Sequence, residues 1–271
     1  MWAIYAWGAG LLCLTFGVNA EVKVEQVALS YAAQPSELFV SFAAFSDEQT
    51  AKVLYGVSPH HLTESITLTG SKYTLNGYTS PMLYRGQLSN LVPGNKKYYY
   101  SVGSDALGFS PVQGFKTHPG VGTEDVTFHI FGDLGLTNNS VNTLTELIKY
   151  EAGLRTPSGG IVSMGDLSYA NGDEPLWDTF GNMITAASGH IPMSTTLGNH
   201  EWFDSSNYDF TAYLARFNNP PVNGKRELYY SFDSGLVHFV MVAGKLEFVD
   251  FVHGSCDPAC LTLCFVYLCV F

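Results

Sequence analysis

The sequence predicts two domains, a β-sandwich followed by an α/β domain. Short strand-like runs separated by turn residues dominate positions 21–120. From 124 to 242 the pattern alternates strand, loop and helix, which is typical of βαβ units around a largely buried sheet. With 271 residues, 46% of them apolar, the chain is long enough to bury a core in each part.

The strand-like runs of the first part have the spacing of a β-sandwich of the fibronectin type III kind, which positions or binds rather than catalyses. We interpret His60 and His61 as an exposed loop pair, with metal binding as the alternative. Residues 116–125 combine proline, glycine and charge, so we expect a linker there with His118 in solvent. The runs are ELFVSFAAF, AKVLYGV, SITLTG, LYRGQLSNL and KKYYYSVGS.

The second part alternates three strand-like runs with three helix-like runs. We expect His129 and His238, which lie on strand-like stretches, to be core residues with satisfied hydrogen bonds. The strands are VTFHIF (126–131), GIVSMG (160–165) and IPMSTTLG (191–198), and the helices are SVNTLTELIKYEA, PLWDTFGNMITAAS and YDFTAYLARF.

Each of these three strands ends in a glycine followed by a side chain that can bind metal. The motifs are FGDLG with Asp133, MGDLSY with Asp166 and Tyr169, and LGNHE with Asn199 and His200. The number of residues from Asp133 to Asp166 equals the number from Asp166 to Asn199, and it is about the length of one βαβ unit. Ligand sites in open α/β sheets lie at the carboxyl ends of the strands, so we expect these loops to converge.

The residue types indicate a hard oxygen-and-nitrogen site suited to Mn, Fe or Zn. A carboxylate can bridge two ions, and two ions can hold a phosphoryl group for in-line displacement. A tyrosine phenolate prefers a strongly Lewis-acidic ion, which indicates Fe(III). Taken singly, Asp133 could cap a helix, Asn199 could be a turn residue, His200 an ordinary loop histidine, and Tyr169 a packing residue.

The motifs GDLG, GDLSYA and GNHE resemble those of the purple acid phosphatases, within the metallophosphoesterases. The resemblance runs from Val27 to about Val242 and includes LSYAAQPSELFVSF and NLVPGNKKYYYSVGS. It implies that Asp133 and Tyr169 bind the ferric ion, Asp166 bridges, and Asn199 binds a divalent ion (Zn, Fe or Mn). It implies that His200 contacts phosphate and assists proton transfer.

The chain departs from the family after Val242. The resemblance implies three further histidine ligands from two later motifs, one of them G-H-x-H, and neither motif occurs here. Residues 243–271 form a divergent, cysteine-rich apolar tail, which favours a truncated or alternatively spliced end. Cys256, Cys260 and Cys264 could share a helical face, with metal binding as an alternative.

The resemblance therefore implies hydrolysis of phosphate monoesters at a binuclear centre, carried by an N-terminal domain (21–120) and the first half of a metallophosphoesterase domain (124–242). The alternative is a catalytically impaired isoform that acts as a secreted binding or decoy protein. A third interpretation, a β-sandwich adhesion module, ignores residues 124–242.

Residues 1–20 carry no charged side chain and end in Val18-Asn19-Ala20, so we expect a cleaved signal peptide and a secreted or lysosomal protein; a buried N-terminal helix is the alternative. Asn138-Asn139-Ser140 is a candidate glycosylation sequon. The net charge of −11 and the lack of any Lys/Arg cluster argue against nucleic-acid or anionic-membrane partners. The apolar tail is too short for a membrane span, and the oligomeric state is not indicated.

Overall fold

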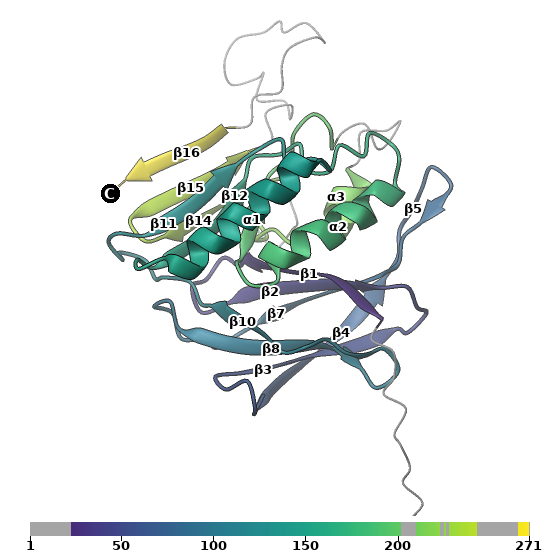
Figure 1. Ribbon diagram of the computed structural model, residues 1–271, viewed down its shortest axis with the longest axis horizontal. Coiled ribbons are helices and arrows are strands. Elements are labelled where there is room, and N and C mark those ends of the chain that lie inside the picture. Colours follow the sequence, from purple (N-terminus) through teal and green to yellow (C-terminus); the bar gives the residue numbers. More distant parts are fainter. Residues whose placement is uncertain (1–22, 202–209, 223–224, 226–227, 243–264, 271) are drawn as a thin grey trace, which may run out of the picture.

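The computed structural model describes residues 23–201, 210–222, 225 and 228–242, and the backbone of 265–270. A β-rich N-terminal part lies below a part that contains helices (Figure 1). The two-domain organisation expected from the sequence is confirmed. Residues 1–20, with the expected signal peptide, lie outside the described residues, as do Cys256, Cys260 and Cys264.

The N-terminal part is one curled antiparallel sheet with the order β1-β2-β7-β4-β3-β8-β10, and β9 pairs with β8. The link between β4 and β7 consists of only two residue pairs. In β8, Tyr98, Tyr100 and Val102 alternate into the core, as period-two side chains must. The strands are β1 (Val24–Tyr31), β2 (Leu38–Ala44), β3 (Thr50–Gly56), β4 (Glu64–Ser71), β7 (Met82–Leu88), β8 (Lys97–Ser104), β9 (Gly108–Phe109) and β10 (Gln113–Lys116), with a hairpin of β5 (Thr74–Leu75) and β6 (Tyr78–Thr79).

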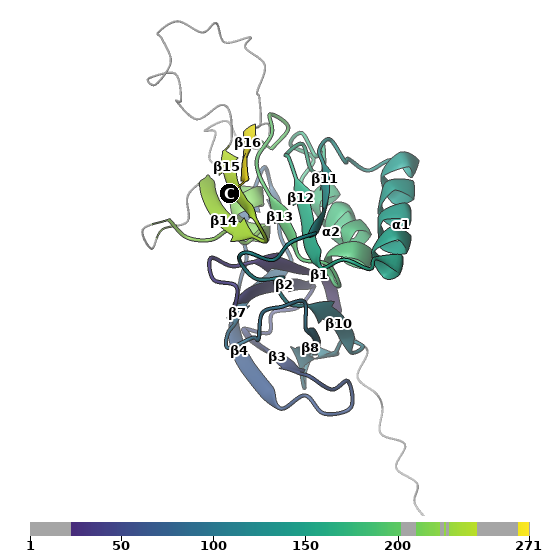
Figure 2. The same ribbon diagram turned by 90° about the vertical axis from the view of Figure 1, so that its left-hand side faces the viewer.

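A three-stranded parallel sheet, ordered β11-β12-β13, forms the centre of the second part. Helices α1 and α2 lie on one side of it, and an antiparallel sheet β14-β15-β16 lies on the other (Figure 2). Phe128 of β11 meets Phe239 of β15 edge to face at 4.9 Å. The strands are β11 (Thr127–Phe131), β12 (Ser158–Ser163), β13 (Met193–Thr195), β14 (Tyr229–Ser234), β15 (Val237–Val242) and β16 (Phe265–Val270), and the helices are α1 (Asn138–Gly153), α2 (Pro175–Ser188) and α3 (Thr211–Arg216).

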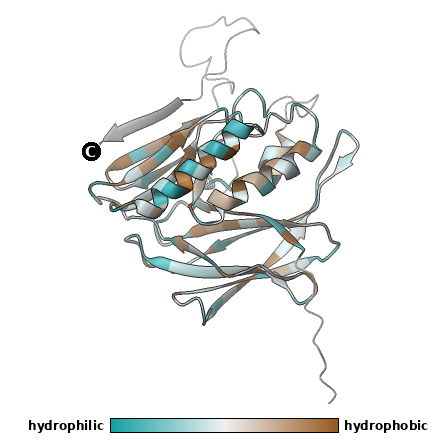
Figure 3. Cartoon of the chain, viewed as in Figure 1, coloured by the Kyte–Doolittle hydropathy of each residue, from teal (hydrophilic) through white to brown (hydrophobic). Residues whose placement is uncertain are grey.

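The two long helices differ in how much of their surface the fold covers. Helix α2 buries Trp177, Phe180 and Ile184, whereas α1 buries little more than Leu144 and Leu147. Figure 3 shows the corresponding difference, with α1 carrying more teal than α2. Helix α2 therefore lies at the junction with the N-terminal sheet, where it packs against β1, and α1 lies at the surface.

Helix α3 carries a buried arginine that ties the two parts together. Arg216 donates to the Asp178 carboxylate of α2 at 3.0 Å and to Gln26 Oε1 of β1 at 2.9 Å. It also donates to the Tyr78 hydroxyl at 3.2 Å, and that hydroxyl donates to Asp178 at 2.5 Å. Because the charge is paired and hydrogen-bonded, its burial is tolerated.

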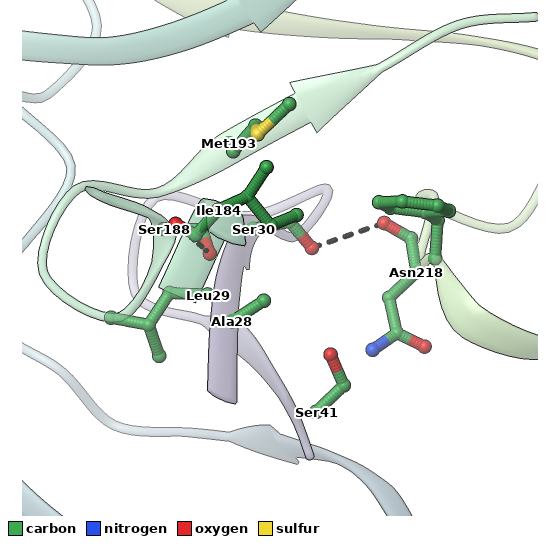
Figure 4. Close-up of a pocket in the computed structure, with 9 residues that line it drawn as sticks. Ala28, Leu29, Ser30, Ser41, Ile184, Ser188, Met193 and Asn218 are labelled. Carbon is green, nitrogen blue, oxygen red and sulfur yellow. Dashed lines mark hydrogen bonds between the residues drawn. The ribbon is translucent and has the colours of Figure 1, made fainter. Parts of the chain in front are cut away.

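A small cavity lies at the same junction, between β1, β2, α2 and β13 (Figure 4). The Ser30 hydroxyl points across it and donates to the Asn218 carbonyl at 3.0 Å. Met193, which lines the cavity, is the first residue of β13. The cavity therefore lies at the amino end of the parallel sheet, away from the strand-end motifs.

The expected linker at 116–125 is partly wrong, because its first half is integrated into the fold. His118 is only 3% exposed, not in solvent. Its carbonyl accepts from the Gly94 amide at 2.8 Å, its Nδ1 accepts from the Gly120 amide at 3.0 Å, and its ring packs edge-on against Tyr31. A histidine can be buried at such a site because its backbone carbonyl and its ring Nδ1 both find hydrogen-bond partners.

The other histidine expectations have mixed outcomes. His129 is nearly buried and its Nε2 lies 2.9 Å from the Glu151 carboxylate, as expected for a satisfied core histidine. His238 is only half-buried, with its Nδ1 2.6 Å from the Asp233 carboxylate, because Phe239 and Met241 take the inward positions of β15. The exposed pair His60 and His61 is confirmed as exposed.

Candidate metal centre

The parallel sheet delivers the three candidate motifs to one edge. Phe131 pairs with Ser163, and Ser163 pairs with Thr195, so the three strands end at the same level. The motif residues follow these strand ends by two, three and four positions, which places their loops side by side. They are Asp133, Asp166 and Asn199.

Two of the motif glycines are required because the loops touch backbone to backbone. A Cβ on Gly165, which has φ of +83°, would lie 2.5 Å from the amide nitrogen of Gly198. A Cβ on Gly198 would lie 2.0 Å from Asp166 Oδ1. At Gly132 the nearest atom to such a Cβ is 3.6 Å away, an ordinary contact, so close approach is not its role.

The loops hold four side chains on left-handed backbone. Asp133, Asp166, Tyr169 and Asn171 have φ values of +54°, +50°, +54° and +51°. Aspartate and asparagine adopt this conformation fairly readily, whereas a bulky residue such as Tyr169 does so rarely. Each such residue costs on the order of 1 kcal/mol or more, and such residues concentrate at functional sites.

Tyr169 points at Asp133 rather than into the core. Its hydroxyl donates to Asp133 Oδ1 at 2.8 Å. Burial raises the pKa of the Tyr169 phenol, and the hydrogen bond to Asp133 and the nearby carboxylates of Asp166 and Glu201 raise it further. The negative potential that opposes the phenolate is the potential that would attract a cation.

The spacing of these two oxygens fits a shared metal ion. Adjacent oxygen ligands of an octahedral ion with bonds of about 2.0–2.1 Å lie about 2.9 Å apart. Tyr169 Oη and Asp133 Oδ1, which are 2.8 Å apart in an ordinary hydrogen bond, are close enough to share such an ion with little rearrangement. Asp133 is therefore not the helix cap considered above; the N-cap of α1 is Thr137, which forms a capping box with Ser140.

A hydrogen bond joins the Asp166 side chain to the backbone of His200. The His200 amide donates to Asp166 Oδ1 at 3.0 Å. The His200 ring lies 4.1 Å from the Tyr169 ring, centre to centre, and its Nδ1 lies 2.6 Å from Asn171 Oδ1. Donation from Nδ1 to this amide oxygen fixes the neutral ring as the Nδ1–H tautomer, with the lone pair on Nε2.

Asn199 lies between Gly198 and His200 in the same loop and is half-buried. Four of the five expected site residues are therefore connected directly or through one neighbour, and Asn199 joins them by its position in the chain. The remaining expected site, the sequon residue Asn138, is exposed at the first turn of α1, with Ser140 buried beneath it.

Two residues that hydrogen-bond to the candidate site are not marked by the motif pattern of the sequence, Asn171 and Glu201. The Glu201 side chain is fully buried and accepts three backbone N–H groups. Burial raises its pKa to about 7, although these hydrogen bonds favour the charged form. The fourth letter of GNHE was the available signal, but nothing in its spacing shows that its partners are backbone amides.

An open cleft borders the site between the loop after β11 and the start of α1, and both Asp133 and Tyr169 line it. Within the described ranges no group of three His, Cys, Asp or Glu side chains could hold a metal ion. A centre here would therefore depend on the phenol of Tyr169 and the amide of Asn199 in addition to the two aspartates. This oxygen-rich set suits a hard cation.

A parallel sheet whose strand ends carry GD, GD and GNH motifs is typical of the metallophosphoesterases. Residues 24–117 match the family model described as "Purple acid Phosphatase, N-terminal domain". "Purple acid phosphatase 21" of Arabidopsis thaliana is 31% identical over 80% of this chain and 48% of its own length. The chain belongs to the purple acid phosphatase family.

Two further comparisons agree with this assignment. "Probable inactive purple acid phosphatase 9" of Arabidopsis thaliana is 28% identical over 86% of this chain and 43% of its own length. The solved purple acid phosphatase PPD1 from yellow lupin (Lupinus luteus) seeds shares the fold, with a TM-score of 0.69 at 22% identity. That match covers 87% of this chain and 48% of the lupin chain.

The chain spans about half the length of the curated relatives it matches. Among the described residues, none of the helices has both the length and the hydropathy that a membrane span needs.

Proposed function

We propose that these residues form part of a binuclear metal centre that hydrolyses phosphate monoesters. The observation that carries the proposal is the 2.8 Å contact between Tyr169 and Asp133 at the edge where Asp166 also lies. The N-terminal sheet, expected to be of the fibronectin type III kind, would position the catalytic domain rather than take part in the chemistry.

The roles follow from chemistry and from the family resemblance. Asp133 and Tyr169 would hold Fe(III), Asp166 would bridge, and Asn199 would bind the divalent ion, either Zn, Fe or Mn. Two such cations supply the Lewis acidity that an in-line displacement at phosphorus requires. His200, held by Asn171 as the Nδ1–H tautomer, would contact the phosphate and transfer a proton through Nε2.

The second candidate function is that of a non-catalytic binding or decoy protein, which does not hydrolyse phosphate monoesters. It is favoured by the ligand count, because none of the eight histidines lies in a G-H-x-H pattern. A protein made of these 271 residues alone would offer four ligands where the family uses seven. With oxygen donors only, one ion should bind much more weakly.

A rate comparison separates the two candidates. The 271-residue protein and a version extended by a family-like C-terminal half would be loaded with iron and zinc and assayed on an aryl phosphate at acidic pH. Losing one ion should raise the barrier by several kcal/mol, and each ~1.4 kcal/mol is tenfold in rate. We expect the shorter protein to be slower by orders of magnitude, with its purple colour faint or missing.

Two other outcomes would contradict parts of the proposal. Comparable turnover by the two proteins would show that the three imidazoles are dispensable. No turnover by either protein would contradict the hydrolytic proposal itself.

Secretion remains part of the proposal. An exposed Asn138 is accessible to a glycan in the folded protein, and the uncharged start of the chain is the reason to expect export. Mass spectrometry of secreted material should find Glu21 at the N-terminus and a mass that falls on deglycosylation. Intact Met1 in the medium would contradict it.

A further inference from the structure

The loop after β12 and the loop after β13 are joined by one buried carboxylate. Glu201 Oε2 accepts from the Asp166 amide at 2.8 Å and from the Gly198 amide at 2.7 Å. Glu201 Oε1 accepts from the Leu167 amide at 2.7 Å. The side chain is fully buried, so these three N–H groups are its main source of stabilisation in place of water.

These hydrogen bonds begin where the sheet ladder stops. The pairing of β12 with β13 ends at Ser163 and Thr195, followed by one backbone hydrogen bond from the Thr196 amide to the Ser163 carbonyl at 3.0 Å, so the ladder stops short of Asp166 and Gly198. The link is reciprocal, because the His200 amide donates back to the Asp166 side chain at 3.0 Å. Glu201 thus binds the backbone of Asp166 while its own loop binds the Asp166 carboxylate.

We propose that Glu201 is a positioning residue that sets the distance between Asp166 on one loop and Asn199 and His200 on the other. The inference rests on the proposed function of the site. A carboxylate suits this task because it is acceptor-only and every contact it makes here is with a donor. An amide in its place would direct an NH2 group at one or more of the three backbone N–H groups.

A direct role for Glu201 in the reaction does not fit its surroundings. Both carboxylate oxygens are engaged with backbone donors, and the residue does not line the cleft bordered by Asp133 and Tyr169. Its effect would therefore pass through the residues it holds, and the site should lose metal affinity when those residues move.

The test uses the full 271-residue chain with Glu201→Gln, Glu201→Asp and the control Glu151→Gln. Glu151 lies on α1 and contacts His129 and Ser158, the first residue of β12, at the opposite end of the same sheet. The control therefore removes a hydrogen-bonded carboxylate of the same sheet, one whose partners are side chains rather than backbone amides, while leaving the site untouched. Thermal unfolding would record the general destabilisation in each variant.

Two readouts distinguish positioning from general stability. Amide hydrogen exchange in the metal-free protein should be faster at Asp166, Leu167 and Gly198 in Glu201→Gln, but not in the control. Calorimetric titration with Zn²⁺ should show affinity reduced by about 10- to 100-fold. Glu201→Asp should fall between wild type and Glu201→Gln, and Glu151→Gln should bind Zn²⁺ as wild type does even if it melts earlier.

Unchanged exchange at the three amides, or unchanged Zn²⁺ affinity in Glu201→Gln, would overturn the inference. If Glu201→Gln does not fold, Glu201→Asp takes its place and must bind more weakly than wild type. If wild type binds no Zn²⁺ while the exchange pattern follows the prediction, the metal-centre proposal fails and the connection between the loops stands.

Discussion

At Gly198 the site depends on the absence of a side chain. A methyl group there would lie 2.0 Å from Asp166 Oδ1 and 2.5 Å from the Asp166 amide, and the nearby backbone atoms cannot move independently. The contact is steric only, since this glycine does not have a left-handed φ. The residue that must move is the proposed bridging ligand.

We therefore expect Gly198→Ala to weaken Zn²⁺ binding and to lower the free energy of unfolding by about 1–3 kcal/mol, as overpacking does. Gly153→Ala is the matched control, because a Cβ at the end of α1 would meet nothing within 4 Å. That control should leave binding unchanged and stability equal or higher by about 0.5–1 kcal/mol. Zn²⁺ calorimetry and urea unfolding measure both effects, and wild-type affinity in Gly198→Ala would contradict the account.

Individual site residues differ in how far the sequence could predict them. Asp133, Asp166 and Asn199 were predictable, because a polar residue after a strand-ending glycine in a parallel sheet lies at the carboxyl edge of the sheet. Glu201 was not, because its partners are backbone amides that no residue pattern encodes. His118 was misjudged because its neighbours Pro119 and Gly120 are typical of loops, whereas the protein buries it against Tyr31.

At the scale of elements, the segment that follows β10 should make stability depend on pH. Burial lowers the pKa of His118, although Asp233 partly offsets the effect. Below the ordinary histidine value of about 6.5, the unfolded chain takes up a proton that the folded chain does not. The free energy of unfolding should therefore fall as pH drops from 6.5 toward the lower folded-state pKa.

We expect His118→Gln to be less stable than wild type at pH 7.5 but to lose less stability on going to pH 5. The control is His60→Gln, in the exposed loop between β3 and β4, which should keep the wild-type pH dependence. Urea unfolding at the two pH values gives the comparison. If the free energy of unfolding of His118→Gln changed with pH as much as that of wild type, His118 would not contribute to the pH dependence.

Element positions were largely predictable and their pairing was not. The run PLWDTFGNMITAAS coincides with α2, because its apolar residues recur at helical spacing and Pro175 marks its first turn. The strand order β1-β2-β7-β4-β3-β8-β10 depends on contacts between distant segments, which periodicity does not contain. The strand expected at 191–198 is shorter, because β13 covers only Met193–Thr195 and the buried residues Thr196 and Leu197 already belong to the loop.

At the scale of the whole molecule, the candidate site depends on the junction of the two parts. Helix α2 follows the loop that carries Asp166 and Tyr169, and it is held to β1 and α3 through Asp178 and Arg216. The N-terminal sheet thus supports the helix that leads away from the site. In this way the N-terminal sheet can support the candidate site without supplying any of its proposed ligands.

Anomalous diffraction shows directly whether Asp133, Tyr169, Asp166 and Asn199 hold metal together. Crystals of the 271-residue protein would be soaked in millimolar Zn²⁺ or iron and measured at the absorption edge of the metal. We predict an anomalous peak within about 2.0–2.2 Å of Asp133 Oδ1 and Tyr169 Oη, bordered by Asp166, and no such peak in Tyr169→Phe crystals at the same soak. A Tyr169 hydroxyl still bonded to Asp133 with no peak beside it, or an undiminished peak in Tyr169→Phe, would contradict the account.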